Sequence, residues 1–553
     1  MRSPQAPLHA PRATSDVDTQ GLARLGYEQE LHRGVGSFSS FAAGFSFVSI
    51  LTTVFQLFGL GFGLGGAAFF WAWPLVFGGQ LLVALNFAQL AARWPISGAI
   101  FQWSSRLAGA RFGWFTGWTM IIGQILTVAV AAIAVQAVLP AIWDGFQIVG
   151  GPGADPSVAS PTGAANAVVL GLVMLAVTTI VNITSVRLMA RVTSFGVLIE
   201  IVGVVVLIGA LFLLPHRSAS VVFTTAGSTS TEPYVWAFLA SSLMAAYVMV
   251  GFDSAGELAE ETHNPRRTTP KTIVRALTVS GLGGGLLIIG ALVAAPSLTD
   301  GKLASQGLAW VITSTLGDVF GRLLLCTVAV AVFACTLAVQ TAGARMVYSM
   351  AREKALPFHR TLARVSPRTG TPIAASIVVG VGAGLALAVN IGQSAIFTAL
   401  SSLCIAMLYL AYLGVTGPLL VQRITLRRTG LPTGVDEDGK PLFTLGRWGI
   451  PLNALAVAFQ IGMAINLIWP RPEIYDLTGT SWWLQYSALL FIGGVLLVGW
   501  AWSSWRHRVH GPITLAEVPT TAAVPVPAAA AAANPVAEAP ASASASASAS
   551  VEA

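Results

Sequence analysis

A dozen long stretches of this chain contain almost no Lys, Arg, Asp or Glu, and the charged residues are concentrated in the gaps between them. Charged residues make up only 10% of the sequence, against roughly 25% in soluble globular domains. About 18 consecutive apolar residues form a helix long enough to cross the hydrocarbon of a bilayer. The sequence therefore predicts an all-α integral membrane protein with twelve transmembrane helices. They are expected near residues 38–62, 68–92, 114–139, 164–182, 192–214, 235–257, 272–295, 320–350, 372–390, 395–422, 450–469 and 482–503.

The distribution of basic residues predicts the orientation of these helices. An even number of spans places both termini on one side, and only four of the 30 Lys and Arg residues fall on the other, namely Arg217, Lys302, Arg322 and Arg471. Cytoplasmic loops carry an excess of Lys and Arg, so both termini are predicted to be cytoplasmic, in a multi-pass protein of the cell membrane. Because the basic residues lie in short loops, the net charge of +7 favours contact with membrane lipids and argues against a nucleic-acid partner.

Two of the predicted spans contain residues that interrupt a helix at mid-membrane depth. Residues 44–53 mix glycine, Ser, Thr and β-branched residues, and residues 250–257 place two glycines around the carboxylate of Asp253. Glycine weakens a helix interior by up to ~1 kcal/mol, and unwound backbone is tolerated in a membrane only where it meets protein or lines a cavity. Small-residue helix packing is the alternative explanation for the first stretch alone.

The two interrupted spans are the first and the sixth, which are corresponding positions in two halves of five helices. Such pairing is typical of transporters built from inverted repeats, with the binding site at the broken helices. We therefore expect a LeuT-type 5+5 inverted repeat with two additional C-terminal helices. The expected organisation is a partly disordered cytoplasmic tail (1–35), a first repeat (36–215), a second repeat (235–424), two further helices (450–505) and a disordered, low-complexity Ala- and Ser-rich tail (511–553).

Three stretches resemble the amino acid–polyamine–organocation (APC) transporter superfamily. They are Trp-Pro-Ile-Ser-Gly-Ala-Ile-Phe-Gln-Trp at 94–103, the segment from Gly-Phe-Asp at 251–253 to Pro-Lys at 270–271, and Arg-Met-Val-Tyr-Ser-Met-Ala-Arg-Glu-Lys-Ala-Leu-Pro at 345–357. Asp253 and the Ser and Thr pattern of the first span look most like the amino acid/choline branch. The resemblance implies a permease for an amino acid, 4-aminobutyrate, choline or a polyamine.

The substrate is expected between spans one and six. The amides around residues 46–52 would receive its anionic end, because a half-helix N-terminus offers unpaired N–H groups and partial positive charge. Asp253 is expected to meet the substrate ammonium or to gate access to it, with an alternative role as the cap of the second half of span six. Aromatic side chains would add cation–π contact. The predicted substrate-binding residues are Gly44, Ser46, Ser49, Thr52, Trp236, Gly251, Phe252 and Asp253.

Glu200 is the predicted carrier of a coupling proton. It is the only ionisable residue of span five, where several proton-coupled members of the resembled family have a lysine. Burial favours the neutral form of a carboxyl, and rocking of the repeats would rehydrate it and release the proton. A structural glutamate bonded to span one or eight is the rival interpretation. Sodium coupling through carbonyls and hydroxyls, such as those of Thr336 and Thr341, also remains open.

The sequence offers no residues for a chemical reaction. It contains no Ser/His/Asp set, no His-Glu-x-x-His helix, no metal-ligand cluster and no phosphate-binding loop, so neither an enzyme, a metal site nor a cofactor is expected. A membrane solute sensor on the same fold, which binds without transporting, is the alternative function. Glu260, Glu261, Arg266, Arg267 and the basic run at 345–368 are expected to form solvated ion pairs worth at most ~1 kcal/mol each.

Overall fold

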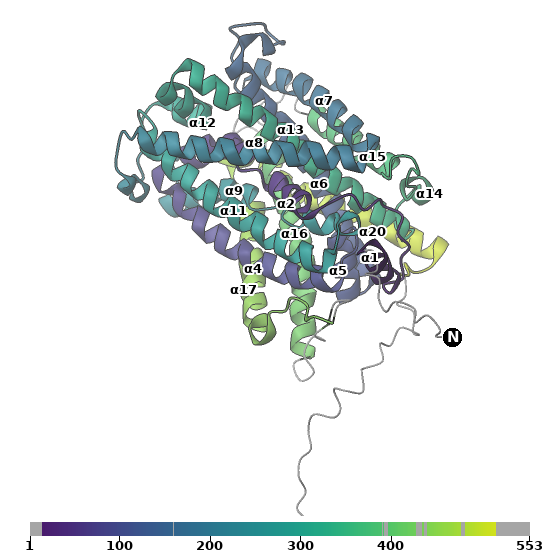
Figure 1. Cartoon of the computed structure of the whole chain (residues 1–553). Coiled ribbons are helices and arrows are strands. Elements are labelled where there is room, and N and C mark those ends of the chain that lie inside the picture. The colour runs from purple at the N-terminus through teal and green to yellow at the C-terminus, as the bar shows by residue number, and fades with distance from the viewer. Residues whose placement is uncertain are drawn as a thin grey trace, which may run out of the picture.

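The computed structural model describes residues 14–158, 160–389, 391, 396–426, 434–435, 439–476 and 482–515, and their regular structure is helical (Figure 1). In this part of the chain no β-sheet forms, and β pairing is limited to isolated bridges joining Val35 to Thr262 and Val435 to Pro441. Most of the predicted tail at 511–553 lies outside the described residues.

Ten helical segments of the described chain are long and apolar enough to cross a membrane. Each predicted span coincides with one of these segments or with one of two shorter apolar helices. The chain is therefore a multi-pass membrane protein, as predicted. The helices are α2 (Ser37–Val48) with α3 (Ile50–Gly65), η1 (Ala67–Trp71) with α4 (Ala72–Arg93), α6 (Ala110–Ile142), α7 (Pro161–Thr184), α8 (Val186–Leu213), α9 (Tyr234–Val248), α11 (Pro265–Ala294), α13 (Asp318–Arg352), α15 (Ile373–Ala388), α16 (Ile396–Thr425), α17 (Gly449–Ile468) and α20 (Ser487–His510).

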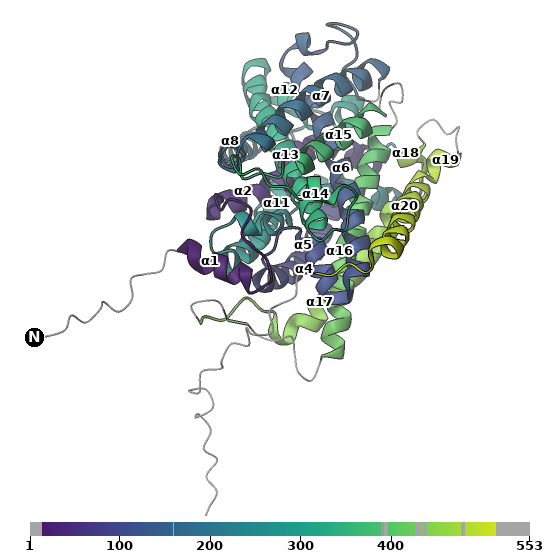
Figure 2. The same cartoon turned by 90° about the vertical axis from the view of Figure 1, so that its right-hand side faces the viewer.

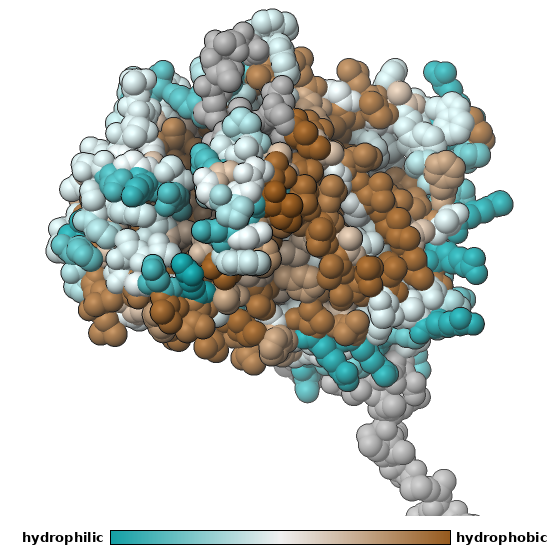
Figure 3. All heavy atoms as spheres, turned by 90° about the horizontal axis from the view of Figure 1, so that it is seen from above, coloured by the Kyte–Doolittle hydropathy of each residue, from teal (hydrophilic) through white to brown (hydrophobic). Residues whose placement is uncertain are grey.

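Packing in the bundle follows the helical period of the sequence. On α8, Val197, Glu200 and Val204 recur every three or four residues and are buried, whereas Leu198 and Val202 are more than half exposed. One face of this helix therefore packs on the bundle, against α2, α11 and α13, and the other presents apolar side chains outward, as lipid contact requires. Figure 3 shows an apolar outer surface on a whole face of the molecule, where apolar residues cross the middle and hydrophilic residues gather at either side.

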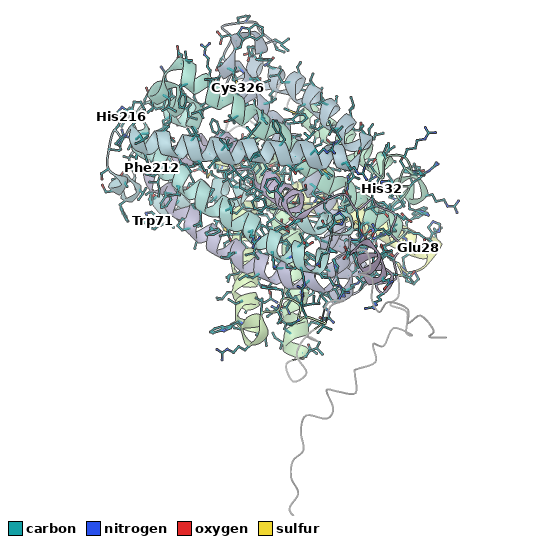
Figure 4. The ribbon with its side chains drawn as sticks, in the orientation of Figure 1. Glu28, His32, Trp71, Phe212, His216 and Cys326 are labelled. Atoms are coloured by element: carbon teal, nitrogen blue, oxygen red, sulfur yellow. The ribbon has the colours of Figure 1, made fainter. Side chains whose placement is uncertain are left out.

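The ends of the bundle carry the loops that the sequence assigns to opposite sides. Figure 4 places Trp71 and His216 at one end, and Glu28 and His32 at the other. This arrangement agrees with the predicted alternation of the loops. Two views at right angles (Figures 1 and 2) show α20 along the outside of the bundle beside α16, with which it is in contact.

Several shorter helices fall in segments that the hydropathy pattern treats as loops or tail. They are α1 (Thr14–Ala23), η2 (Asp144–Phe146), α5 (Ala99–Ala108), η3 (Ala219–Phe223), α12 (Gly301–Leu316), α14 (His359–Leu362), η5 (Gly446–Trp448) and α18 (Pro472–Tyr475). A further short helix, α19 (Trp482–Gln485), occupies the first residues of the last predicted span, before α20. The largest of them, α12, folds back on α3, and a Cβ at Gly59 would lie 2.4 Å from the carbonyl oxygen of Ala304. These helices are too short or too polar to be recognised as spans.

Candidate functional site

The first predicted interruption lies at a single residue between α2 and α3. Ser49 adopts φ 34° and ψ 91°, a conformation outside the helical region, and helical structure resumes at Ile50. Its amide still bonds the Phe45 carbonyl at 2.7 Å, and its hydroxyl accepts from the Thr52 amide at 3.4 Å, as an N-cap does. The chain thus leaves one helix and starts another within one residue, and the first amides of α3 bond side chains instead of carbonyls of a preceding helical turn.

Glu200 reaches these amides from α8. Its Oε1 lies 2.9 Å from Ser49 Oγ and 3.2 Å from the Leu51 amide nitrogen, and the side chain is fully buried. Its Oε2 has no hydrogen-bond partner among the described residues. The carboxyl group therefore lies against the positive end of α3, where the sequence predicts the anionic end of the substrate.

The second interruption separates α9 from the short helix α10 (Ser254–Glu257). Gly251 within it has φ 92°, and a Cβ there would lie 1.7 Å from Cδ1 of Phe47 at the end of α2. Only glycine fits, both for its backbone conformation and for the ring that lies against it. Ser254 adds a bond from its hydroxyl to the Ala43 carbonyl at 3.3 Å. The two interrupted spans are therefore in direct contact at their breaks.

Asp253 is buried at the start of α10. The hydroxyl of Tyr412, on α16, donates to its Oδ1 and accepts a 2.9 Å hydrogen bond from the Gly251 amide. Asp253 makes no side-chain capping bond to α10, and its Oδ2 has no partner in the part of the chain that the structure describes. Tyr412 was not among the predicted site residues, because sequence alone does not indicate which buried tyrosine of a distant helix meets this carboxylate.

Aromatic and small side chains surround this carboxylate. The ring centroid of Phe252 lies 5.4 Å from that of Tyr412 and 5.9 Å from that of Phe87. Gly44 allows close packing against α11, since a Cβ there would lie 3.1 Å from Cβ of Ala276. The same Cβ would lie at an ordinary contact distance, 3.7 Å, from the Phe252 carbonyl oxygen. The hydroxyl of Ser46 is buried without a hydrogen-bond partner among the described residues. Seven of the eight predicted substrate residues thus lie at the two breaks.

Trp236 lies apart from them. It lies in the first turn of α9, is 46% exposed and stacks on Trp469 with ring centroids 6.1 Å apart. Twelve residues of helix separate it from Val248, which is about 18 Å at 1.5 Å per residue. The structure therefore does not bring Trp236 to Asp253, and its position suits an interfacial aromatic residue.

The two hydroxyls considered for sodium bond within the protein. Thr336 donates to the Val332 carbonyl at 2.8 Å, and Thr341 Oγ1 lies 2.6 Å from Asn182 Oδ1 and 2.7 Å from the Leu337 carbonyl. Across the described residues, no group of three or more His, Cys, Asp and Glu side chains could hold a metal ion.

Further buried polar groups lack partners in the helices around the breaks. They include both side-chain polar atoms of Gln80 on α4 and of Gln124 on α6, and the hydroxyl of Tyr409 on α16. Such groups are uncommon in folded proteins unless a water, ion or ligand satisfies them. A single Gln or Tyr in an apolar span does not by itself indicate a binding site, so the sequence analysis did not select these residues.

Two buried ion pairs lie at one end of the interrupted spans. Arg345 on α13 bonds both carboxylate oxygens of Glu261 at 2.7 and 3.2 Å, with no side-chain exposure on either residue. Next to it, Arg352 bonds Glu260, which also accepts from the Ser97 amide at 3.0 Å. Both acidic residues belong to η4 (Ala259–Glu261) and are buried. The prediction of solvated pairs is therefore wrong for these two pairs.

The two ion pairs are buried because the segment before α2 covers them. The amides of Gly34 and Val35 bond the Glu261 carbonyl at 3.1 and 2.9 Å. Tyr27 donates to Glu353 Oε1 at 2.7 Å, and burial, followed by the charge of Glu353, raises the pKa of Tyr27 to about 12. The phenol therefore keeps its proton, and its hydrogen bond, at physiological pH. Sequence composition does not reveal this cover.

The chain is similar to known permeases over most of its length. A family model described as amino acid permease matches residues 35–496. The Amino-acid permease BAT1 of Arabidopsis thaliana is 28% identical over 519 residues, which cover 89% of this chain and 96% of that protein. The Amino-acid permease BAT1 homolog of Oryza sativa subsp. japonica is 28% identical over 523 residues, covering 90% and 96%. The GABA-specific permease of Saccharomyces cerevisiae is 26% identical over 525 residues, covering 93% and 89%.

Proposed function

The chain belongs to the amino acid permease family, and we propose that it moves an amino acid or related amine across the cell membrane by alternating access, coupled to protons. Family membership confirms the resemblance to the APC superfamily and indicates a transporter rather than an enzyme. The observation that carries the proposal is the contact between two interrupted spans, each with a buried carboxyl group at its break.

The proposed architecture has twelve spans, with two inverted repeats of five followed by two further helices and both termini in the cytoplasm. The break at Ser49 and the break at Gly251 support it, because they occur in spans at corresponding positions of the two halves. The charge distribution supports the orientation.

The proposed substrate lies between the breaks. Its ammonium would approach Asp253 Oδ2, which lacks a partner among the described residues, beside the ring of Phe252. Its carboxylate would bind the amides at the start of α3, and Ser46 would donate a further hydrogen bond. A zwitterion such as an amino acid or 4-aminobutyrate satisfies both ends, whereas choline and polyamines have no carboxylate.

Proton coupling is proposed to depend on Glu200. As a carboxylate it accepts strongly from Ser49 and the Leu51 amide. A proton on Glu200 would weaken these bonds and free the donors of α3 for a substrate carboxylate. Proton binding and substrate binding would then favour each other. Sodium is the alternative coupling ion, and it would need the carbonyls near Ser49.

Transport of this kind requires the closed end to open. In the proposed cycle, the Arg345–Glu261 and Arg352–Glu260 pairs hold the cytoplasmic side closed and separate when the repeats rock. Both ion pairs join the segment after α10 to α13. A movement of this segment relative to α13 would therefore break both ion pairs at once.

Uptake into sealed proteoliposomes tests the function. With an inside-alkaline pH gradient, we expect the parent to accumulate a labelled amino acid from a panel that also contains 4-aminobutyrate, choline and putrescine. Binding without accumulation of any of these would instead indicate the solute sensor. Acceleration by a sodium gradient alone would contradict proton coupling.

The role of Glu200 is tested by Glu200→Gln, with Glu232→Gln in an exposed loop as the matched control. The amide oxygen of Gln still accepts from Leu51 but binds no coupling proton. We expect gradient-driven accumulation to be lost, and solute exchange to persist, in Glu200→Gln only. Undiminished gradient-driven accumulation in this variant would remove Glu200 from the mechanism.

A further inference from the structure

A cavity of about 430 Å³ lies at the end of the bundle, between the first turn of α6 and the last turns of α20. It is separate from the interrupted spans. Its polar lining is basic, with Arg111, Arg506, His507 and Arg508, and includes the hydroxyl-bearing Ser503. None of the residues that line it is acidic, so the cavity suits an anion.

The arginines that line the cavity have guanidinium N–H groups without hydrogen-bond partners among the described residues. Arg506 is buried, and the carbonyls of Lys354 and Gly511 hold its Nε and Nη1 at 3.1 and 2.9 Å, while its Nη2 has no partner among the described residues. The side chains of Arg111 and Arg508 are exposed and make no hydrogen bond or ion pair within the described chain. One buried and two exposed guanidinium groups thus line the same cavity. Guanidinium groups bind phosphate oxygens bidentately.

Two further features add positive potential here. The cavity begins at Ala110, the first residue of the 33-residue α6, where amides lack intrahelical partners and the helix dipole favours an anion. Beside it, burial lowers the pKa of His359, and the basic groups of Arg360, Lys354, His510 and Arg506 lower it further.

The surface next to the cavity is apolar. On α20, Leu497, Trp500 and Trp505 are at least half exposed, and the ring of Trp502 lies 4.9 Å from that of Trp505. Exposed apolar side chains on a spanning helix contact acyl chains, and tryptophans gather at the headgroup level of a bilayer. This position therefore favours a lipid over a soluble ion as the source of an anion.

We propose that this cavity binds the phosphate headgroup of an anionic phospholipid, whose acyl chains lie along the exposed face of α20. The bound phosphate would join the start of α6 to the end of α20. Because Arg506 also bonds the Lys354 carbonyl just beyond α13, the lipid would be linked through Arg506 to the end of the helix that carries Arg345 and Arg352.

The test uses the purified full chain in detergent and measures lipid binding by native mass spectrometry. Phosphatidylglycerol is compared with phosphatidylcholine of the same acyl chains, and inorganic phosphate serves as the soluble anion. The variant is Arg111→Gln/Arg508→Gln, and the control is Arg187→Gln/Arg191→Gln, which removes the same charge from exposed positions at the start of α8.

We expect the parent to prefer phosphatidylglycerol, and the cavity variant to lose at least tenfold of that affinity, since each arginine contributes roughly fivefold. The control should stay within about twofold of the parent. Equal binding of both lipids by the parent, an unaffected cavity variant or an equal loss in the control would overturn the proposal. Inorganic phosphate binding as tightly as phosphatidylglycerol would show an anion site without a lipid.

Discussion

The buried pair of Arg345 and Glu261 provides the sharpest test of the packing at the closed end. Replacing Arg345 by Met keeps most of the side-chain length but removes the donors that hold Glu261 at 2.7 and 3.2 Å. The carboxylate then stays buried without its counter-charge. Loss of one partner of a buried pair destabilises a protein by ~3–5 kcal/mol, whereas a solvated pair contributes at most ~1 kcal/mol.

A second substitution separates charge from packing. In Arg345→Met/Glu261→Leu no charge is left buried, and replacement of a buried ion pair by apolar residues is often neutral or stabilising by ~1–4 kcal/mol. We therefore expect the double variant to recover most of the stability that the single variant loses. Arg364→Met is the control, because Arg364 is exposed and surface substitutions change stability by only about 0.5 kcal/mol.

Equilibrium unfolding in mixed micelles measures these differences, and the 16 tryptophans of the chain supply the fluorescence signal. The expected order of stability is the parent and the control, then the double variant close to them, and Arg345→Met well below. A loss under 1 kcal/mol in Arg345→Met would refute the argument from burial. A double variant whose loss of stability equals the sum of the losses in Arg345→Met and Glu261→Leu would show that the two side chains act independently.

Two further substitutions test the two breaks, and a third tests the position of Trp236. In Gly251→Ala the new Cβ would lie 1.7 Å from the ring of Phe47, on a residue with positive φ. We therefore expect a loss of stability of ~2–5 kcal/mol in the same unfolding assay. The control Gly462→Ala, where a Cβ meets open space, should be neutral or slightly stabilising. Tyr412→Phe leaves the Gly251 amide and Asp253 unbonded, so stability should fall by ~1–3 kcal/mol per group, and solute affinity, measured by scintillation proximity, should fall with it. Trp236→Ala should leave solute affinity unchanged, and a large loss would return Trp236 to the site.

The interrupted spans could be predicted from local sequence because the residues that break a helix are also the residues at the breaks. Ser49 lies within the predicted stretch 44–53, and Gly251 within 250–257. A carboxylate between glycines at membrane depth indicates a functional site without knowledge of its neighbours. The spans themselves follow from hydropathy, since a bilayer requires a fixed length of apolar helix.

Contacts between distant segments could not be predicted in the same way. The partner of Glu200 is 151 residues away in the chain, and Tyr412 is 159 residues from Asp253. A periodic pattern shows which face of a helix is buried, but it does not show which helix packs on that face. The burial of Glu261 depends on the segment before α2, whose composition is that of an exposed tail. The prediction that Trp236 lies beside Asp253 ignored the helical rise. Twelve residues of α9 separate Trp236 from the break.

The position of Glu200 makes a physical demand on any coupling mechanism. The start of α3 presents a small set of donors, and the Leu51 amide already bonds a protein carboxyl group. Two carboxylates at one helix start would repel each other in a medium that screens charge poorly. A substrate carboxylate can therefore bind there only if Glu200 is neutral or moves away. A proton on Glu200 meets the first condition without any movement of α8. The free energy that couples proton binding to substrate binding is then the repulsion that is avoided when the start of α3 carries one negative charge instead of two.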